Sequence, residues 1–136
     1  MELTYDIPRH VEFVFRHLAD MEHFVAVHPV IYRVEALGGD RYVMHEKLPF
    51  WLAPAFRYPA TVEPDPAAGR IRMRASVLRL VHFTLDFQLS AVGPHTRVDE
   101  TIEIRSVLPV KRLMKYILQR LHGQLFHNIG RAAGKA

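Results

Sequence analysis

The sequence predicts an α+β domain in which one seven-stranded antiparallel sheet is covered by a long C-terminal helix. Apolar residues recur at every second position in seven segments, as they do in half-buried strands. Six of these segments follow one another along the chain, which is typical of an antiparallel meander. After Pro109 the apolar period becomes helical, and this helix offers the largest apolar stripe for covering the sheet.

The first strand is predicted over residues 1–7, where apolar and polar side chains alternate. Pro8 ends this strand and opens a helix, because proline is tolerated in a first helical turn. Asp20 is expected to cap a second short helix. His28-Pro29 ends that helix, since the residue before a proline leaves the α conformation.

The remaining strands are separated by segments rich in Gly, Pro and Asp, which favour tight turns. The Gly38-Gly39-Asp40 segment is the clearest of these turns. The strands are predicted at residues 30–37, 41–48, 55–63, 70–77, 81–92 and 96–106. The C-terminal helix follows, and its apolar stripe consists of Val110, Leu113, Met114, Ile117, Leu118, Leu121, Leu125, Phe126 and Ile129.

Composition narrows the class of protein. A length of 136 residues suits a single domain over residues 1–136. The chain has no Cys, which excludes disulfides, thiolate metal sites and thiol nucleophiles. No apolar run reaches the roughly 18 residues that span a bilayer. The N-terminus lacks the basic start and apolar run of a secretion signal, so we expect a cytoplasmic protein.

The net charge of +4, from 18 basic and 14 acidic residues, does not indicate a nucleic-acid partner. The cations are dispersed, and Arg70, Arg72 and Arg74 alternate along a strand without the aromatic residues that stack on bases. The helices show no recognition-helix arrangement. The sequence also lacks nucleotide-binding and Ser-hydrolase motifs, so no cofactor is expected.

The order of elements resembles that of the START/Bet v 1-like superfamily, also described as SRPBCC or polyketide cyclase/dehydrase-like. The segments that carry the resemblance are YDIPRHVEFVFRHLADMEHF, HPVIYRVEALGGDRYVMHEKL and the amphipathic helix after SVLPVKRL. The resemblance covers nearly the whole chain and implies a helix-grip fold. In that fold a curved sheet wraps around the long helix and encloses a cavity for an apolar ligand. These motifs carry no catalytic signature, and one fold hosts many functions.

Alternation along the strands predicts which side chains face this cavity. The apolar face of the sheet should point toward the long helix, while the opposite face carries charges of both signs that suit cross-strand pairs. The predicted ligand-binding residues are Tyr32, Tyr42, Met44, Tyr58, Met73, Phe83, Phe87 and Ile102 on strands and Leu113, Ile117 and Leu121 on the helix.

Two acids interrupt the apolar face, namely Glu46 and Glu100. A buried carboxylate must be neutralised, paired or hydrated. One interpretation is a catalytic acid or base, or a polar anchor for a ligand, within an apolar pocket. The other is structural: a strand-end Glu bonded to Tyr or Arg, or a bulge that changes the face on which the side chain lies.

The nine His residues do not predict a metal site, because none has the spacing of a compact ligand pair. His28, at the corner between helix and strand, is the best His for a polar group at the pocket rim. The alternative is a capping or exposed His.

The turns at one end of the meander are unusually apolar for loops. The predicted rim of the cavity mouth comprises His28, Phe50, Trp51, Leu52, Leu78, Arg79, Leu108, Lys111 and Arg112. Three interpretations remain open. This rim forms a lid over the cavity, a homodimer or partner contact, or a peripheral membrane contact with its cations beside anionic headgroups.

The first functional hypothesis is therefore a protein that binds, with or without transporting, a hydrophobic small molecule or lipid. The second is a cofactor-independent enzyme similar to polyketide cyclases, in which a pocket carboxylate removes a proton next to a carbonyl. The third is a protein-interaction module that uses the apolar rim. The sequence leaves open whether the chain is an enzyme.

Overall fold

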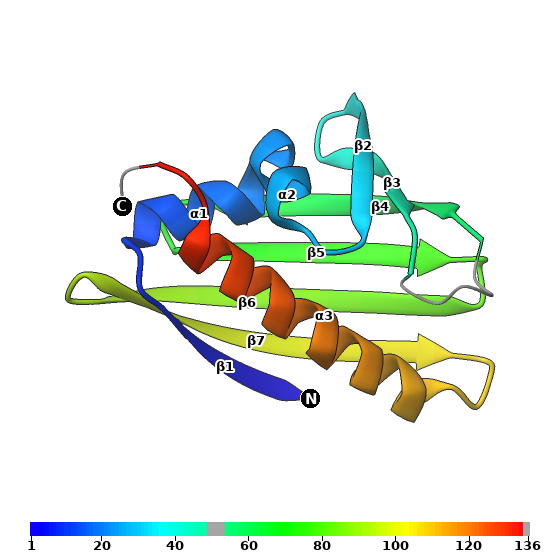
Figure 1. Cartoon of the computed structure of the whole chain (residues 1–136). Helices are drawn as coiled ribbons and strands as arrows, with labels where there is room; N and C mark the ends of the chain where they lie inside the picture. The colour runs from blue at the N-terminus through cyan, green and yellow to red at the C-terminus, as the bar shows by residue number, and fades with distance from the viewer. Residues whose placement is uncertain (49–53, 135–136) are drawn as a thin grey trace.

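The computed structural model describes residues 1–48 and 54–134. It contains ten elements in the predicted order (Figure 1). They are β1 (Glu2–Ile7), α1 (Val11–Ala19), α2 (Met21–Val27), β2 (Ile31–Gly38), β3 (Arg41–Glu46), β4 (Phe56–Asp65), β5 (Arg70–Val77), β6 (Val81–Val92), β7 (His95–Ser106) and α3 (Lys111–Arg131).

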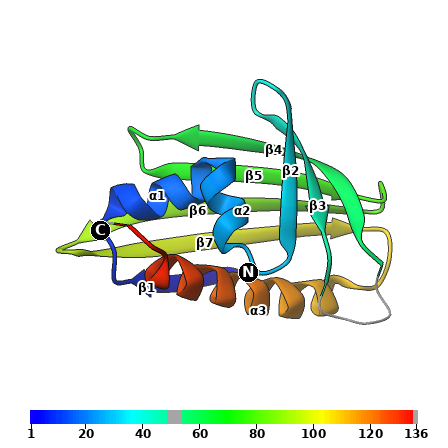
Figure 2. The same cartoon turned by 45° about the horizontal axis from the view of Figure 1, so that its top comes forward.

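All seven strands form one antiparallel sheet in the order β1-β7-β6-β5-β4-β3-β2. The first and last strands of the chain are therefore neighbours, and the rest form a meander. The three helices lie on one face of the sheet, which curves around them (Figure 2). This arrangement confirms the predicted α+β helix-grip fold. Within the described residues, no helix is long and apolar enough to cross a membrane.

Two local features that the sequence predicts are present, a helix cap and cross-strand ion pairs. The Asp20 carboxylate caps α2 by accepting a hydrogen bond from the backbone N–H of Glu22 at 3.0 Å. The outer face of the sheet carries cross-strand ion pairs, in which Arg70 and Arg72 both contact Asp86 at 2.8 and 2.9 Å. These charges are satisfied on the surface, which leaves the opposite face of the sheet apolar.

One strand departs from the predicted alternation. The pairing of β2 with β3 shifts between Ile31 and Arg33, so that Tyr32 is an extra residue in the strand. As a result Ile31 faces the core, and 53% of the Tyr32 surface is exposed. The placement of Tyr32 on the inner face was wrong for this reason.

The long helix α3 is packed against the rest of the fold through its C-terminal half. Its buried residues are His122, Leu125, Phe126 and Ile129. The Arg9 guanidinium binds the carbonyl oxygens of Gly130 and Gly134 at 3.1 and 2.9 Å. A Cβ on Gly130 would lie 3.3 Å from the Pro8 ring, a tight contact, so α3 packs closely against the chain here.

The N-terminal half of α3 is less buried, and four of its apolar residues face a space in front of the sheet, namely Met114, Ile117, Leu118 and Leu121. The Asn128 side chain donates to the carbonyl oxygen of Val27 at 2.8 Å, which ties the C-terminal half of α3 to α2. Anchored at one end in this way, α3 leaves room between its first turns and the strands.

The turn between β5 and β6 has an unusual backbone. Leu78 and Arg79 have φ angles of 54° and 58°, in the left-handed region. This conformation costs a residue with a Cβ roughly 1–2 kcal/mol relative to glycine. Hairpin turns of this kind usually carry Asn or Gly. The sequence instead places a large apolar and a cationic side chain there.

Relief of the backbone strain in this turn should stabilise the protein. We expect Arg79→Gly to raise the free energy of unfolding by roughly 0.5–1 kcal/mol, because glycine adopts positive φ without steric cost. Urea denaturation would measure it. Arg105→Gly, in the extended backbone of β7, is the matched control and should lower stability. Equal destabilisation by the two substitutions would contradict the strained turn.

Candidate functional site

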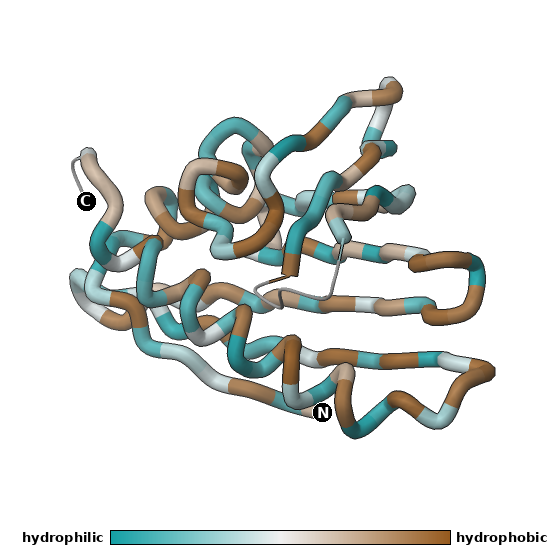
Figure 3. Tube along the Cα trace, turned by 45° about the vertical axis from the view of Figure 1, so that its right-hand side comes forward, coloured by the Kyte–Doolittle hydropathy of each residue, from teal (hydrophilic) through white to brown (hydrophobic). Residues whose placement is uncertain are grey.

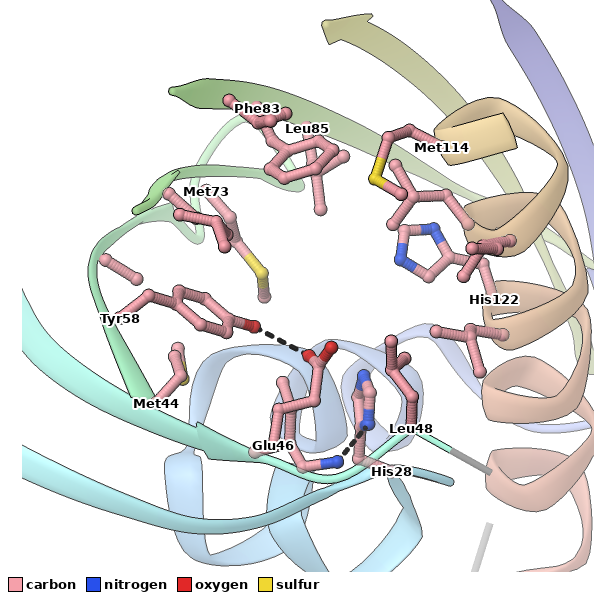
Figure 4. A pocket seen from close by; sticks show the side chains of 18 of the residues that line it. His28, Met44, Glu46, Leu48, Tyr58, Met73, Phe83, Leu85, Met114 and His122 are labelled. Carbon is pink, nitrogen blue, oxygen red and sulfur yellow. Dashed lines mark hydrogen bonds between the residues drawn. The ribbon is translucent and has the colours of Figure 1, made fainter. Parts of the chain in front are cut away.

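A cavity of about 360 Å³ lies between the N-terminal half of α3 and strands β3 to β6 (Figure 4). Its walls are apolar almost throughout. The sheet contributes Met44, Ala60, Met73, Ala75, Phe83, Leu85 and Phe87, and α3 contributes Met114, Ile117, Leu118, Leu121 and Leu125. Such a cavity excludes charge and favours an apolar occupant.

Five polar residues line the cavity, and one of them, Arg74, directs its guanidinium to Glu63 at 3.4 Å. The other four come from four different parts of the chain, and we call them the polar corner. They are His28 between α2 and β2, Glu46 at the end of β3, Tyr58 on β4 and His122 on α3. Figure 4 shows their side chains directed into the cavity. Titratable groups gathered inside an apolar pocket are typical of binding and catalytic sites.

Strand register brings Glu46 and Tyr58 together. Met44 pairs with Tyr58 and Glu46 pairs with Phe56, so Glu46 and Tyr58 are diagonal neighbours on one face. The Tyr58 hydroxyl donates a hydrogen bond to Oε1 of Glu46 at 2.8 Å. Burial raises the pKa of Glu46, although the Tyr58 hydrogen bond opposes this. Burial and the neighbouring carboxylate raise the pKa of Tyr58 well above its usual value, so its hydroxyl stays protonated.

His28 is held in one tautomer by the backbone. The N–H groups of Val30 and Ile31 both donate to its Nδ1, at 3.2 and 2.9 Å. Because Nδ1 accepts, the proton of the neutral ring is on Nε2. Burial, with the nearby His122, lowers the pKa of His28 to about 3, so the ring is neutral at neutral pH. His28 thus offers the cavity an N–H donor without a charge.

A second buried acid stands behind His122. Glu100 is 1% exposed, and its Oε2 lies 2.5 Å from Nδ1 of His122, at an angle unlike that of a hydrogen bond. Burial and the negative charge of Glu100 raise the pKa of the nearby Tyr5 to about 12. Glu100 does not line the cavity itself, but it contacts a His that does.

The structure brings most of the predicted ligand-binding residues together. Those that line the cavity are Met44, Tyr58, Met73, Phe83, Phe87, Ile117 and Leu121. Tyr42 packs against the main core, and Ile102 belongs to a smaller cluster with Val81 and Ile104. Leu113 is 54% exposed, because it lies at the outer edge of the α3 stripe. With Tyr32, these three lie outside the cavity wall.

Only some residues of the predicted rim line the cavity. His28 and Leu108 line the cavity. Leu78, Arg79, Lys111 and Arg112 are exposed at the end of the molecule that the cavity approaches. Phe50, Trp51 and Leu52 lie outside the described residues. Among the residues that are described, no three His, Asp or Glu side chains are placed to hold a metal ion.

His122 is a polar residue of the cavity that sequence reasoning missed. It lies four residues after Leu118 and four before Phe126, which places it on the apolar stripe of α3. Because the stripe was assigned from apolar residues alone, a His at this position was not included in it. A His on the stripe of a helix opposite a strand with an inward Glu is the signal that would have found the contact.

The comparisons with known proteins match structures but not sequences. No family model and no curated protein sequence matches the chain. Ara h 8.0201 superimposes with a TM-score of 0.78 at 11% identity, over 96% of this chain and 93% of that one. A START superfamily protein from Mycobacterium smegmatis superimposes with a TM-score of 0.73 at 17% identity, over 96% and 97%.

The chain has the START/Bet v 1-like fold. The Zhui aromatase/cyclase from Streptomyces sp. R1128 shares it, with a TM-score of 0.74 at 16% identity, over 100% of this chain and 98% of that one. At such low identity the START/Bet v 1-like fold is what these proteins have in common. The polar corner of this chain therefore has to be interpreted from its own residues.

The state of His28 predicts how stability depends on pH. The pKa of His28 is 6.5 in the unfolded chain and about 3 in the folded protein. Between these two values the unfolded chain binds a proton at His28 and the folded protein does not, so protonation favours unfolding. We expect His28 to lower the free energy of unfolding by up to about 1.4 kcal/mol for each pH unit between pH 6.5 and pH 4. The loss stops below the folded pKa.

His28→Asn keeps an acceptor for the two backbone N–H groups but does not titrate, so it should flatten this slope. Urea denaturation across the same pH range would measure it, with His127→Asn, at an exposed position of α3, as the control. A slope unchanged in His28→Asn would show that His28 is not buried in its neutral form.

Proposed function

We propose that this chain binds a hydrophobic small molecule in the cavity and orients it through one polar group at the polar corner. The observation that carries this proposal is the composition of the wall: apolar side chains on every side, with hydrogen-bonding groups gathered at one place. Small-molecule sites are typically built in this way. Burial of apolar ligand surface provides affinity, at about 25 cal/mol per Å² before association costs.

The volume restricts the size of the ligand. About 360 Å³ lies near the lower end of the roughly 300–1,000 Å³ found for small-molecule sites. It suits one compact apolar body, such as fused aromatic rings or part of a single acyl chain. A lipid with two full acyl chains would have to leave much of its surface outside.

The polar corner also restricts the chemistry of the ligand. His28 supplies an uncharged donor, and Glu46 supplies an oxygen that accepts. Burial disfavours charge here, as the raised pKa of Glu46 and the lowered pKa of His28 both indicate. The matching group is a neutral hydroxyl or carbonyl at one end of the ligand.

A pair of ligands that differ only in this group tests the proposal. We expect 2-naphthol to bind about tenfold more tightly than naphthalene, which corresponds to one net hydrogen bond. Glu46→Leu should remove this preference while both ligands still bind. Fluorescence titration would measure it, with Glu103→Leu on the exposed face of β7 as the control. Failure of both ligands to bind the unmodified protein would contradict the proposal.

A second candidate function, acid–base catalysis, is supported by the contact between Glu100 and His122. The Glu100 carboxylate lies 2.5 Å from Nδ1 of His122, where its charge would favour the proton on Nδ1 and leave the Nε2 lone pair free on the other side of the ring. In a bound ketone, His122 would take a proton from the carbon next to the carbonyl. The C–H electron pair then forms the enolate, whose oxygen would accept the His28 Nε2–H.

In a ligand with a second carbonyl, the enolate carbon would attack that carbonyl carbon and form a C–C bond. The resulting alkoxide would take the proton back from His122, so no cofactor is consumed. The aromatase/cyclase similarity supports this class of reaction at the level of fold. Glu100 would be a positioning residue, because it reaches the ligand only through His122.

This second candidate is tested by proton exchange, which needs no knowledge of the natural ligand. In D₂O the protein should accelerate exchange of the methyl protons of 2-acetonaphthone, followed by NMR, by about 10²–10⁴-fold. His122→Gln should abolish the acceleration. Glu100→Gln should reduce the rate without weakening ketone binding. Glu103→Leu is again the control and should exchange as fast as the unmodified protein. Exchange no faster with the unmodified protein than with His122→Gln would exclude catalysis by His122.

A further inference from the structure

One end of the molecule presents exposed apolar and basic side chains that neither the core nor an ion pair explains. We call it the basic apolar end and define it by Leu78, Arg79, Val107, Leu108, Lys111 and Arg112. The β5–β6 turn and the segment before α3 come together here, because the Val107 N–H donates to the Leu80 carbonyl oxygen at 3.3 Å. Figure 3 shows both segments at this end, mostly in the colour of apolar residues.

The apolar side chains here are unusually accessible. Leu78 is 77% exposed, Val107 79% and Leu108 43%. Adjacent exposed apolar residues of this size mark interaction sites in folded proteins. The left-handed backbone at Leu78 and Arg79 also favours an interaction site, since strain of this kind persists where a side chain is needed for function.

The charge of this end has one sign. The longer stretches of chain that contain its residues, 66–85 and 104–136, have no Asp or Glu at all. Within the described part of the chain, Arg79, Lys111 and Arg112 enter no ion pair, unlike Arg70, Arg72 and Arg74 on the outer face of the sheet. An apolar tip surrounded by unpaired cations is complementary to an anionic lipid surface.

The same end leads into the cavity. Leu108 is partly exposed outside and also lines the cavity wall, and Val77 and Val110 on either side of it line the wall as well. A surface that covered this end would therefore lie against the approach to the cavity. A second copy of the chain fits less well, because a two-fold contact would bring together two patches that both carry these three cations.

We infer that the basic apolar end docks on an anionic membrane surface, with Leu78, Val107 and Leu108 in the interface and the cations beside the headgroups. The inference rests on the proposed function in one respect: docking would let an apolar ligand pass between bilayer and cavity without crossing water. The docking itself does not require a ligand.

Vesicle flotation tests the docking. The protein should bind vesicles of phosphatidylcholine mixed with phosphatidylglycerol, bind those of phosphatidylcholine alone weakly, and lose affinity as salt is raised. Leu78→Asp and Arg112→Glu should each lower the affinity about tenfold or more.

Matched controls are available at other ends of the same fold. Val92→Asp makes the same change as Leu78→Asp at the far end of β6, where Val92 is 57% exposed. Arg41→Glu matches Arg112→Glu in charge at the β2–β3 turn. Both controls should leave vesicle binding within about twofold of the unmodified protein.

The unmodified protein failing to float with anionic vesicles would overturn the inference, as would equal losses in the controls and in the test variants. A dimer in light scattering that Leu78→Asp disperses would assign this end to a second copy instead. Naphthol titration of the same variants without vesicles separates the two proposals. Intact naphthol binding with no flotation overturns docking alone, and flotation without naphthol binding overturns the cavity function alone.

Discussion

The one-ended packing of α3 is the constraint on which the cavity depends. The buried residues of α3 all lie between His122 and Ile129, and Arg9 and Asn128 fix that half to the N-terminal elements. Had the whole helix settled onto the sheet, Met114, Ile117 and Leu121 would have filled the space they now enclose. An apolar cavity forgoes packing contacts, and under the proposed function a bound apolar ligand would supply them.

The polar corner follows from the same arrangement. Glu46 is placed by the register of β3 and β4, His28 by the turn that leads from α2 to β2, and His122 by the last apolar turns of α3. These three elements meet only because α3 is anchored close to His122. The low polarity around them holds His28 uncharged and resists ionisation of Glu46, so under the proposed function the corner would recognise neutral groups in preference to ions.

Much of this could be predicted from the sequence, because period and turn residues determine the order of strands and helices. Alternation placed Glu46 correctly on the inner face, and the same pattern failed at Tyr32, where a bulge adds a residue that no composition signal marks. The contact of Glu100 with His122 joins two elements through side chains, which periodicity does not describe. Leu113 shows that a stripe on a helix is wider than the surface a curved sheet can cover.

The central claim is that an apolar ligand occupies the space under the first turns of α3. Methionine methyl groups report on this directly, because Met44, Met73 and Met114 line the cavity while Met1 and Met21 do not. Titration of 2-naphthol into protein with ¹³C-labelled Met methyl groups should shift the NMR signals of the first three and leave the other two in place. Shifts at Met1 or Met21 alone, or at no methionine despite binding, would contradict the account.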